Sequence, residues 1–151
     1  LFQINHQCGL TDAALLQEKY QSMGVLSHVV ATAFIDDMAK AYSQADFVIA
    51  RAGATTLAEL TYVGLPALLI PYPWAAEDHQ THNAKWLEEN GAAKLFAQKE
   101  LTAQILFDEL LRLVENPLVL QQMSQASFAL GQKDTAIRIV DEIERCYGIQ
   151  S

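Results

Sequence analysis

The stretch DFVIARAGATTLAEL, residues 46–60, decides the fold class of this chain. Its first part, Asp46–Ala50, is a short apolar run of the kind found in strands that are buried on both faces of a parallel sheet. Residues 51–53 then turn the chain into a helix that we expect from about Thr55 to Val63, with Gly64 ending it. A strand, a tight turn and a helix in immediate succession are typical of an α/β protein.

The same alternation continues on both sides of this stretch. Thr11 and Asp12 should cap the helix at 13–23, and Asp36 should cap the short helix that follows. Strands are expected at 1–5, within 25–34, at 66–71 and at 92–97, and helices at 13–23, 36–42, 79–90, 102–115, 117–130 and 134–147. Short strands between helices predict a Rossmann-like parallel sheet flanked by helices, and no linker or repeat marks a domain boundary.

Composition limits the function classes. The 151 residues are 51% hydrophobic and carry a formal net charge of −8, so the chain can bury a core but lacks the clustered cations of a nucleic-acid surface. No apolar run approaches the roughly 20 residues that span a bilayer. Cys8 and Cys146 show no CxxC spacing, which argues against a disulfide scaffold or zinc site and suits a cytoplasmic protein. Because the chain begins with Leu1, we expect it to come from inside a longer protein.

The turn after the buried strand is the first candidate site. Gly53 and Ala54 let a ligand approach the backbone, Thr55 and Thr56 add hydroxyl donors, and the N–H groups of a helix start favour a diphosphate. Glu59 follows one turn later, where its carboxylate could accept both hydroxyls of a ribose. The alternative is a capping box, in which Thr56 and Glu59 satisfy the helix N–H groups themselves. The spacing alone leaves both interpretations open.

The start of the helix at 79–90 is a second candidate site. Gln80 and Asn83 share a helix face, and their amides offer the donors and acceptors that sugar hydroxyls need. A solvated helix start is the alternative. We expect no metal site, because a closed set of ligands usually draws on several segments and none stands out. The side chains considered as metal ligands are those of Glu77, Asp78, His79 and His82.

Two further positions follow predicted strands. Phe34 and Ile35 could form an apolar ledge for a flat base, whereas Asp36 is most simply a helix cap. His6 could face a ligand or have a structural role. The chain contains no GxGxxG, GxxxxGK[ST] or GxSxG motif, so dinucleotide-dependent dehydrogenases, P-loop enzymes and nucleophile-elbow hydrolases lack their signatures. No cofactor is therefore expected.

Read together and in this order, these segments resemble the carboxy-terminal domain of the bacterial MurG family of N-acetylglucosaminyltransferases. The resemblance covers Leu1 to about Ala97, and the final helices fit only in pattern. The matching segments are His6-Gln7-x-Gly9, Phe34–Met38, Arg51-x-Gly53-Ala54-x-Thr56-x-x-Glu59, Gly64–Ala67 with Pro71, Gln80-x-x-Asn83-Ala84 and Gly91–Ala93.

The resemblance implies the carboxy-terminal half of a GT-B glycosyltransferase, in which two Rossmann-like domains enclose the active site. It implies that this half binds UDP-N-acetylglucosamine and that the intact enzyme converts lipid I to lipid II in peptidoglycan synthesis, with inversion at the anomeric carbon. Ile35 would contact the uracil and Gln80 the sugar, with Asn83 also binding the donor. The ribose and diphosphate would lie along Gly53, Ala54, Thr55, Thr56, Leu57, Ala58 and Glu59.

Two departures from the family pattern matter. The Gly-rich loop after the family domain's first strand has no counterpart, so we expect residues 1–151 to form a partial domain without its first βα unit. The amino-terminal domain, which carries the lipid I site, the membrane contact and the general base, is also absent. We therefore assign no catalytic residue and expect this chain alone to be inactive.

The intact enzyme would lie peripherally on the cytoplasmic face of the inner membrane. Two alternatives remain at this point. The chain could be the nucleotide-sugar-binding subunit of a split N-acetylglucosaminyltransferase, or a non-catalytic α/β interaction module without nucleotide affinity.

Overall fold

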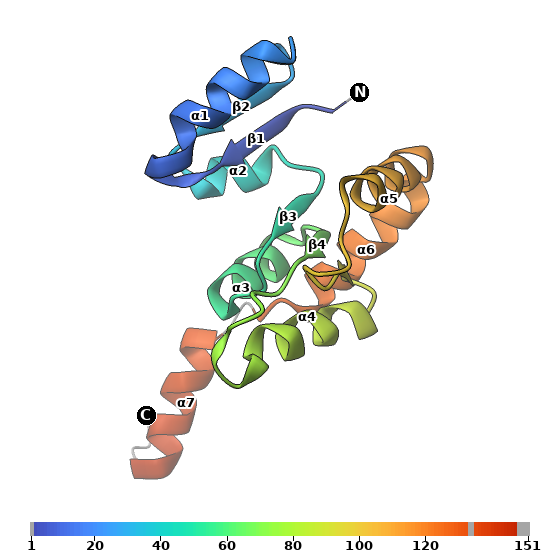
Figure 1. The fold of residues 1–151 in the computed structure, drawn as a ribbon. Coiled ribbons are helices and arrows are strands. Elements are labelled where there is room, and N and C mark those ends of the chain that lie inside the picture. Colours follow the sequence, from blue (N-terminus) through green and yellow to red (C-terminus); the bar gives the residue numbers. More distant parts are fainter. Residues whose placement is uncertain (1, 133–134, 148–151) are drawn as a thin grey trace. The chain divides into compact units, whose positions relative to one another are not determined.

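The computed structural model describes residues 2–132 and 135–147, and the chain divides between residues 44 and 45 into two compact units. Each unit has its own parallel sheet (Figure 1). The amino-terminal unit contains β1 (Ile4–Gln7), α1 (Gly9–Ser22), β2 (Val29–Thr32) and α2 (Met38–Ser43). Within the described ranges, no helix is both long enough and apolar enough to cross a membrane.

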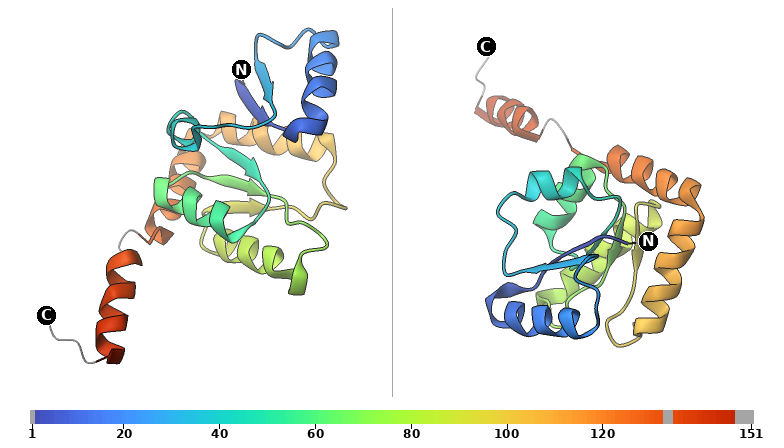
Figure 2. Two further views of the ribbon diagram at one scale, coloured as in Figure 1. Left: turned by 90° about the vertical axis from the view of Figure 1, so that its left-hand side faces the viewer. Right: turned by 90° about the horizontal axis from the view of Figure 1, so that it is seen from above.

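In the amino-terminal unit, β1 pairs in parallel with β2, so that Ile4 lies opposite Val29 and Gln7 opposite Thr32. Helix α1 packs alongside this pair of strands, as both views in Figure 2 show. The Nδ1 atom of His6 lies 2.8 Å from the Tyr20 hydroxyl, which joins β1 to α1. This contact gives His6 a structural role, which was one of the two roles left open by the sequence.

Both predicted helix caps in this unit are wrong. Helix α1 begins at Gly9, where φ is +78°, so Thr11 and Asp12 lie inside its first turn. Helix α2 begins at Met38, and Asp37 caps it by accepting a 2.8 Å hydrogen bond from the Lys40 N–H. The carboxylate of a capping residue must reach an N–H two or three positions along the helix, and Asp37 has that place where Asp36 does not.

The carboxy-terminal unit contains a three-stranded parallel sheet in the order β3, β4, β5. Helices α3 and α4 follow β3 and β4, and α5 and α6 run beside each other (Figures 1 and 2). The elements are β3 (Val48–Ala50), α3 (Ala54–Val63), β4 (Ala67–Leu69), the 3-10 turn η1 (Ala76–Asp78), α4 (His79–Glu89), β5 (Ala93–Leu95), α5 (Ala103–Glu115), α6 (Pro117–Leu130) and α7 (Thr135–Tyr147).

Strand β4 forms the centre of the core. Ala67, Leu68 and Leu69 expose no surface, and Leu60 of α3 is equally buried. β3 differs from the prediction, because Ile49 keeps 45% of its surface exposed. Val48 and Ala50 are half-buried, so neither face of β3 is fully covered within the described residues. The predicted burial of β3 on both faces is therefore wrong, whereas all three residues of β4 are buried.

Helix α6 packs against α3 and the turn that follows it. Gly64 adopts a left-handed conformation, with φ +77°, and an added Cβ there would lie 3.0 Å from the Cβ of Phe128. Ser124 donates a 2.8 Å hydrogen bond to the Gly64 carbonyl. The buried Ser127 donates to the carbonyls of Leu65 and Leu60, at 3.0 and 3.3 Å. These contacts hold the carboxyl end of α3 in place.

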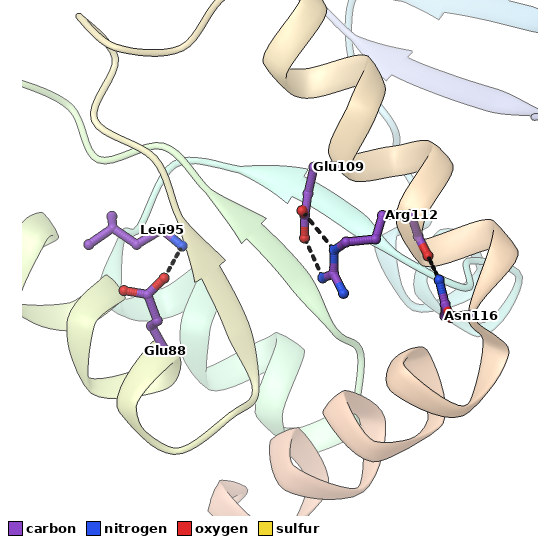
Figure 3. Close-up of polar contacts among 5 residues, drawn as sticks. All are labelled: Glu88, Leu95, Glu109, Arg112 and Asn116. Carbon is purple, nitrogen blue, oxygen red and sulfur yellow. Dashed lines mark hydrogen bonds and ion pairs between the residues drawn. The ribbon is translucent and has the colours of Figure 1, made fainter.

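Further polar contacts link α4 to β5 and stabilise α5 (Figure 3). Glu88 of α4 accepts a 2.9 Å hydrogen bond from the Leu95 N–H, which links α4 to β5. In α5, the Glu109 carboxylate accepts two hydrogen bonds from Arg112, at 2.6 and 3.0 Å. These bonds lower the pKa of Glu109 below its ordinary value of 4.5, and they raise the pKa of Arg112. Asn116 donates to the Arg112 carbonyl at the end of the same helix.

Candidate functional site

The turn between β3 and α3 has an open start. Gly53 is the N-cap of α3, with φ −69° and ψ 145°, and no side chain caps the helix there. An added Cβ at Gly53 would have only the Thr56 hydroxyl oxygen within 4 Å, at 3.8 Å. Within the described residues, the first N–H groups of α3 therefore have no side-chain cap. Such groups, together with the helix dipole, attract an anion.

The capping-box alternative for this turn is wrong. A capping box places its Ser or Thr at the N-cap and its Glu or Gln at the third helical position. Here Gly53 is the N-cap, so Thr56 is itself the third residue of α3 and Glu59 the sixth. Glu59 therefore lies too far into the helix to close such a box.

The other residues of the turn differ in exposure. Leu57 points into the core, and its N–H bonds to the Gly53 carbonyl. Ala54, Thr55, Ala58 and Glu59 are exposed, and Gly53 and Thr56 are half-buried. Contact of these residues with a donor nucleotide stays a prediction.

The loop between β4 and α4 holds the second predicted cluster. The Oε1 atom of Gln80 accepts a 2.9 Å hydrogen bond from the Tyr72 N–H. The Nδ2 atom of Asn83 donates a 3.1 Å hydrogen bond to the Ala52 carbonyl. Each amide thus uses one of its polar atoms within the protein, so these two residues are more than a solvated helix start. No hydrogen bond to the other amide atom, Gln80 Nε2 or Asn83 Oδ1, is found within the part of the chain that the structure describes.

Arg51 begins the segment that matches the family pattern, but the sequence alone assigned it no role. Its Nη1 atom donates to the carbonyls of Ile70 and Pro71, both at 3.1 Å. Its guanidinium carbon lies 5.7 Å from the centre of the Tyr72 ring. The Tyr72 ring in turn meets the exposed Trp74 ring edge-on, with centroids 5.5 Å apart. The position of Arg51 at the end of a strand, directly before the candidate turn, was the available signal.

The start of α4 combines charge with unusual backbone. Glu77 and Asp78 adopt left-handed φ values of 51° and 54°. His79 Nδ1 lies 2.7 Å from the Ala76 carbonyl, and Thr81 donates to Asp78. Within the described residues, no three His, Cys, Asp or Glu side chains gather closely enough to hold a metal ion. The absence of a metal from this protein stays a prediction.

In the amino-terminal unit, Ile35 lies at the edge of a hollow of about 270 Å³. Its N–H donates a 2.9 Å hydrogen bond to Gln7 Oε1, so this backbone donor is already used. Phe34 is exposed beside it. The hollow is lined by Asn5, Val30, Thr32, Phe34, Ile35, Asp37, Lys40, Ala41 and Gln44. Phe34 and Ile35 thus both line this hollow, while their role as an apolar ledge for a base stays a prediction.

Comparison with known proteins gives consistent matches. The model of the glycosyltransferase family 28 C-terminal domain matches residues 1–139. The UDP-N-acetylglucosamine–N-acetylmuramyl-(pentapeptide) pyrophosphoryl-undecaprenol N-acetylglucosamine transferase of Geobacter sp. (strain M21) is 44% identical over 137 residues, which are 91% of this chain and 36% of that protein. The protein of the same name from Tolumonas auensis is 44% identical over 139 residues, 92% of this chain and 39% of that protein. The chain thus spans less than two fifths of the length of these relatives.

Solved structures agree with these relatives. The crystal structure of Acinetobacter baumannii MurG superposes with a TM-score of 0.83 at 36% identity, covering 95% of this chain and 43% of that one. The glycotransferase of kitacinnamycin superposes with a TM-score of 0.70 at 23% identity, covering 95% of this chain and 34% of that one. The second likeness concerns the fold alone.

Proposed function

Because the chain belongs to the family of glycosyltransferase family 28 C-terminal domains, we propose that it binds the sugar-nucleotide donor of an N-acetylglucosaminyltransferase. The predicted fold class is confirmed, since parallel sheets flanked by helices match those of the GT-B enzyme MurG. The proposed donor is UDP-N-acetylglucosamine, which is part of the names of the Geobacter and Tolumonas relatives. The observation that carries the proposal is the open turn at Gly53.

The turn suits the diphosphate part of such a donor. Gly53 starts α3 without a side-chain cap, and a Cβ added there would meet only the Thr56 hydroxyl oxygen, at 3.8 Å. A diphosphate there would accept hydrogen bonds from the first N–H groups of the helix and from the hydroxyls of Thr55 and Thr56. Glu59, on the exposed side of α3, would accept the ribose hydroxyls. Ala54, Leu57 and Ala58 complete the proposed set; because the Leu57 N–H already bonds to the Gly53 carbonyl, the N–H groups proposed for the diphosphate are those before Leu57.

The remaining donor contacts come from other segments. Gln80 presents its Nε2 hydrogens to the sugar, because its Oε1 is occupied by the Tyr72 N–H. Asn83 lies on the same face of α4 as Gln80 and is also among the residues proposed to bind the donor. Ile35 is proposed to contact the uracil. Support for Ile35 is the family resemblance and its place beside Phe34 at the hollow of the amino-terminal unit.

In the whole enzyme, of which this chain covers a part, the acceptor would be lipid I and the product lipid II. The acceptor hydroxyl attacks the anomeric carbon, its proton passes to a base outside these residues, and the bond to UDP breaks with inversion. The N–H groups at the start of α3 would stabilise the charge on the departing UDP. The acceptor site, the membrane contact and a location on the cytoplasmic face of the inner membrane belong to this proposal for the whole enzyme.

Isothermal titration calorimetry tests donor binding directly. The chain is titrated with UDP-N-acetylglucosamine, with UDP and, as the control ligand, with a nicotinamide dinucleotide. We expect saturable binding of the two uridine nucleotides and none of the dinucleotide. Absence of binding for all three ligands in a folded sample would contradict the proposal and favour an interaction module.

A further inference from the structure

We propose that Arg51 and Asn83 are positioning residues that fix two peptide groups, one in the turn before α3 and one in the loop before α4. In this role they orient the groups that meet the diphosphate and the sugar. The inference rests on the proposed donor-binding function and adds to it two residues that act through their neighbours.

The two side chains cross between the same two segments in opposite directions. Asn83 extends from α4 to the Ala52 carbonyl in the turn before α3, at 3.1 Å. Arg51 extends from that turn to the Ile70 and Pro71 carbonyls, which open the loop before α4. Because the two links run in opposite directions, neither segment can shift without breaking one of them.

Arg51 controls the orientation of Gln80 through one peptide plane. The Pro71 carbonyl and the Tyr72 N–H belong to the same planar peptide group and point to opposite sides of it. Arg51 binds the carbonyl and Gln80 Oε1 binds the N–H. An amide whose oxygen is fixed in this way must present its two Nε2 hydrogens elsewhere. Arg51 therefore helps to set the direction in which Gln80 donates.

Asn83 controls the turn in the same manner. The Ala52 carbonyl and the Gly53 N–H share a peptide group, so the bond from Asn83 to the carbonyl turns the Gly53 N–H away from α4. Gly53 is also the N-cap of α3, directly before the N–H groups proposed to meet the diphosphate. Asn83 thus acts on the diphosphate end of the donor, although it lies on the helix predicted to meet the sugar.

The residue types fit these tasks. One Nη1 atom of an arginine carries two hydrogens, which matches the two carbonyls that Arg51 binds. The Tyr72 ring, 5.7 Å from the guanidinium, holds the side chain in place from one face. Asn83 needs its amide nitrogen, because an aspartate carboxylate cannot donate to a carbonyl.

The two links make different predictions for ligand affinity, which calorimetry with UDP and UDP-N-acetylglucosamine separates. Asn83→Ala should weaken both ligands about 3- to 10-fold, since it disturbs the diphosphate turn. Arg51→Ala should weaken UDP-N-acetylglucosamine by a similar factor and UDP much less, since it disturbs Gln80. Arg51→Lys, which retains a cation and donors, should recover part of the loss.

Asn90→Ala is the matched control for Asn83→Ala. Asn90 follows the same helix and also donates its Nδ2 hydrogen to a carbonyl, that of Trp86 at 2.7 Å, but it has no bond to the turn. We expect Asn90→Ala to leave both affinities within twofold of the parent. A loss confined to UDP-N-acetylglucosamine in Asn83→Ala would show a direct sugar contact and overturn the positioning role of Asn83.

Amide hydrogen exchange of the ligand-free chain provides a second measurement that needs no binding. Arg51→Ala should speed exchange at the Tyr72 N–H, while the Leu57 N–H, which bonds to the Gly53 carbonyl, keeps its rate. Unchanged exchange at Tyr72 would overturn the role of Arg51. If the parent chain binds neither uridine nucleotide, the proposed function fails and this inference with it. If the parent binds and the variants match it, only this inference fails.

Discussion

At the scale of single residues, Glu59 provides the most direct test of the candidate site. Glu59→Ala should weaken UDP binding by about 1.5–3 kcal/mol, because a charge-assisted hydrogen bond to the ribose is lost. Calorimetric titration with UDP measures the loss. A nucleotide without free ribose hydroxyls, 2′,3′-dideoxy-UDP, should bind the parent and the variant equally.

Glu89→Ala provides the charge-matched control for this experiment. Glu89 is an exposed carboxylate at the last position of α4, and its removal changes the net charge by the same amount. The affinity of the Glu89→Ala variant for UDP should equal that of the parent chain. Equal affinity in Glu59→Ala and the parent, with both folded, would remove Glu59 from the proposed site.

Gly64 is expected to be the residue of the turn after α3 that tolerates change least. Gly64→Ala should lower the free energy of unfolding by at least about 1–2 kcal/mol, because φ there is +77° and an added Cβ would press on Phe128 at 3.0 Å. Urea denaturation measures the change. Gly24→Ala is the control, since Gly24 also has positive φ, of +69°, but has no neighbouring atom within 4 Å of an added Cβ. A smaller loss in Gly64→Ala than in the control would contradict the packing argument.

The sequence identified the residues of the candidate turn but not their bonds. Local spacing was enough to place Gly53 before a helix and Glu59 one turn into it. The partners of Arg51 and Asn83 lie 19 to 31 positions away along the chain. Such contacts depend on how two segments pack, and no short pattern encodes them. The capping-box interpretation of Thr56 was wrong because it required the helix to begin three residues later than it does.

At the scale of elements, α5 contains a pH-dependent contribution to stability. The folded-state pKa of Glu109 is lowered by the hydrogen bonds from Arg112, so the pair stabilises the fold above the ordinary pKa of 4.5. This contribution is lost as the pH falls from that value through the lower folded-state pKa. Glu109→Gln should therefore destabilise the chain by up to about 1 kcal/mol at pH 7, and progressively less below pH 4.5. Urea titrations at several pH values measure the difference.

The control for this prediction is Glu142→Gln in α7. Glu142 pairs with Arg145 at the same spacing of three residues, but the two side chains are 58% and 76% exposed, against 15% and 41% for Glu109 and Arg112. Water screens the exposed pair more strongly, so its loss should matter less. An equal or larger effect of Glu142→Gln would contradict this account.

The sequence predicted the elements well and their ends less well. Each predicted strand has an observed counterpart, and α3, α4, α5 and α6 begin within one residue of their expected positions. The greatest shift is at α1, which begins at Gly9 instead of near Ala13. A glycine can turn the chain directly into a helix, so the Thr11-Asp12 cap signal lay inside it. The predicted start of α7, at residue 134, lies outside the described residues.

At the scale of the whole molecule, the two sheets leave strand edges without partners. Among the described residues β1 pairs only with β2, and β3 only with β4. Interior strands of a doubly wound sheet have neighbours on both sides. We propose that β1 and β3 each pair with a strand that these 151 residues do not supply, as the missing first βα unit of the family pattern would require.

Extending the chain upstream by one βα unit from a curated relative tests this proposal. The extended chain should unfold at a higher urea concentration and with a steeper transition, because more surface is buried. An extension of equal length and scrambled sequence is the control. Equal stability of the two extended chains would show that no further strand is needed.

The chain as it stands is expected to transfer no sugar. Transfer requires a positioned acceptor and a base, and neither is proposed among these residues. An assay of transfer from UDP-N-acetylglucosamine to a lipid I analogue measures this, with an intact relative as the positive control. Turnover near that of the intact enzyme would refute the proposal that this chain is only the donor-binding part.

The open edge of β3 also has a consequence for how the protein behaves at high concentration. Ile49 is exposed on this strand, and among the described residues no strand pairs along the other edge of β3, so this edge can pair with the same edge of another copy. Natural proteins protect such edges with charges, prolines, covering helices or very short strands, and β3, although short, has neither a charge nor a proline at Val48, Ile49 and Ala50. Concentrated samples should therefore form intermolecular sheet and precipitate, and a lysine placed at Ile49 should keep them clear.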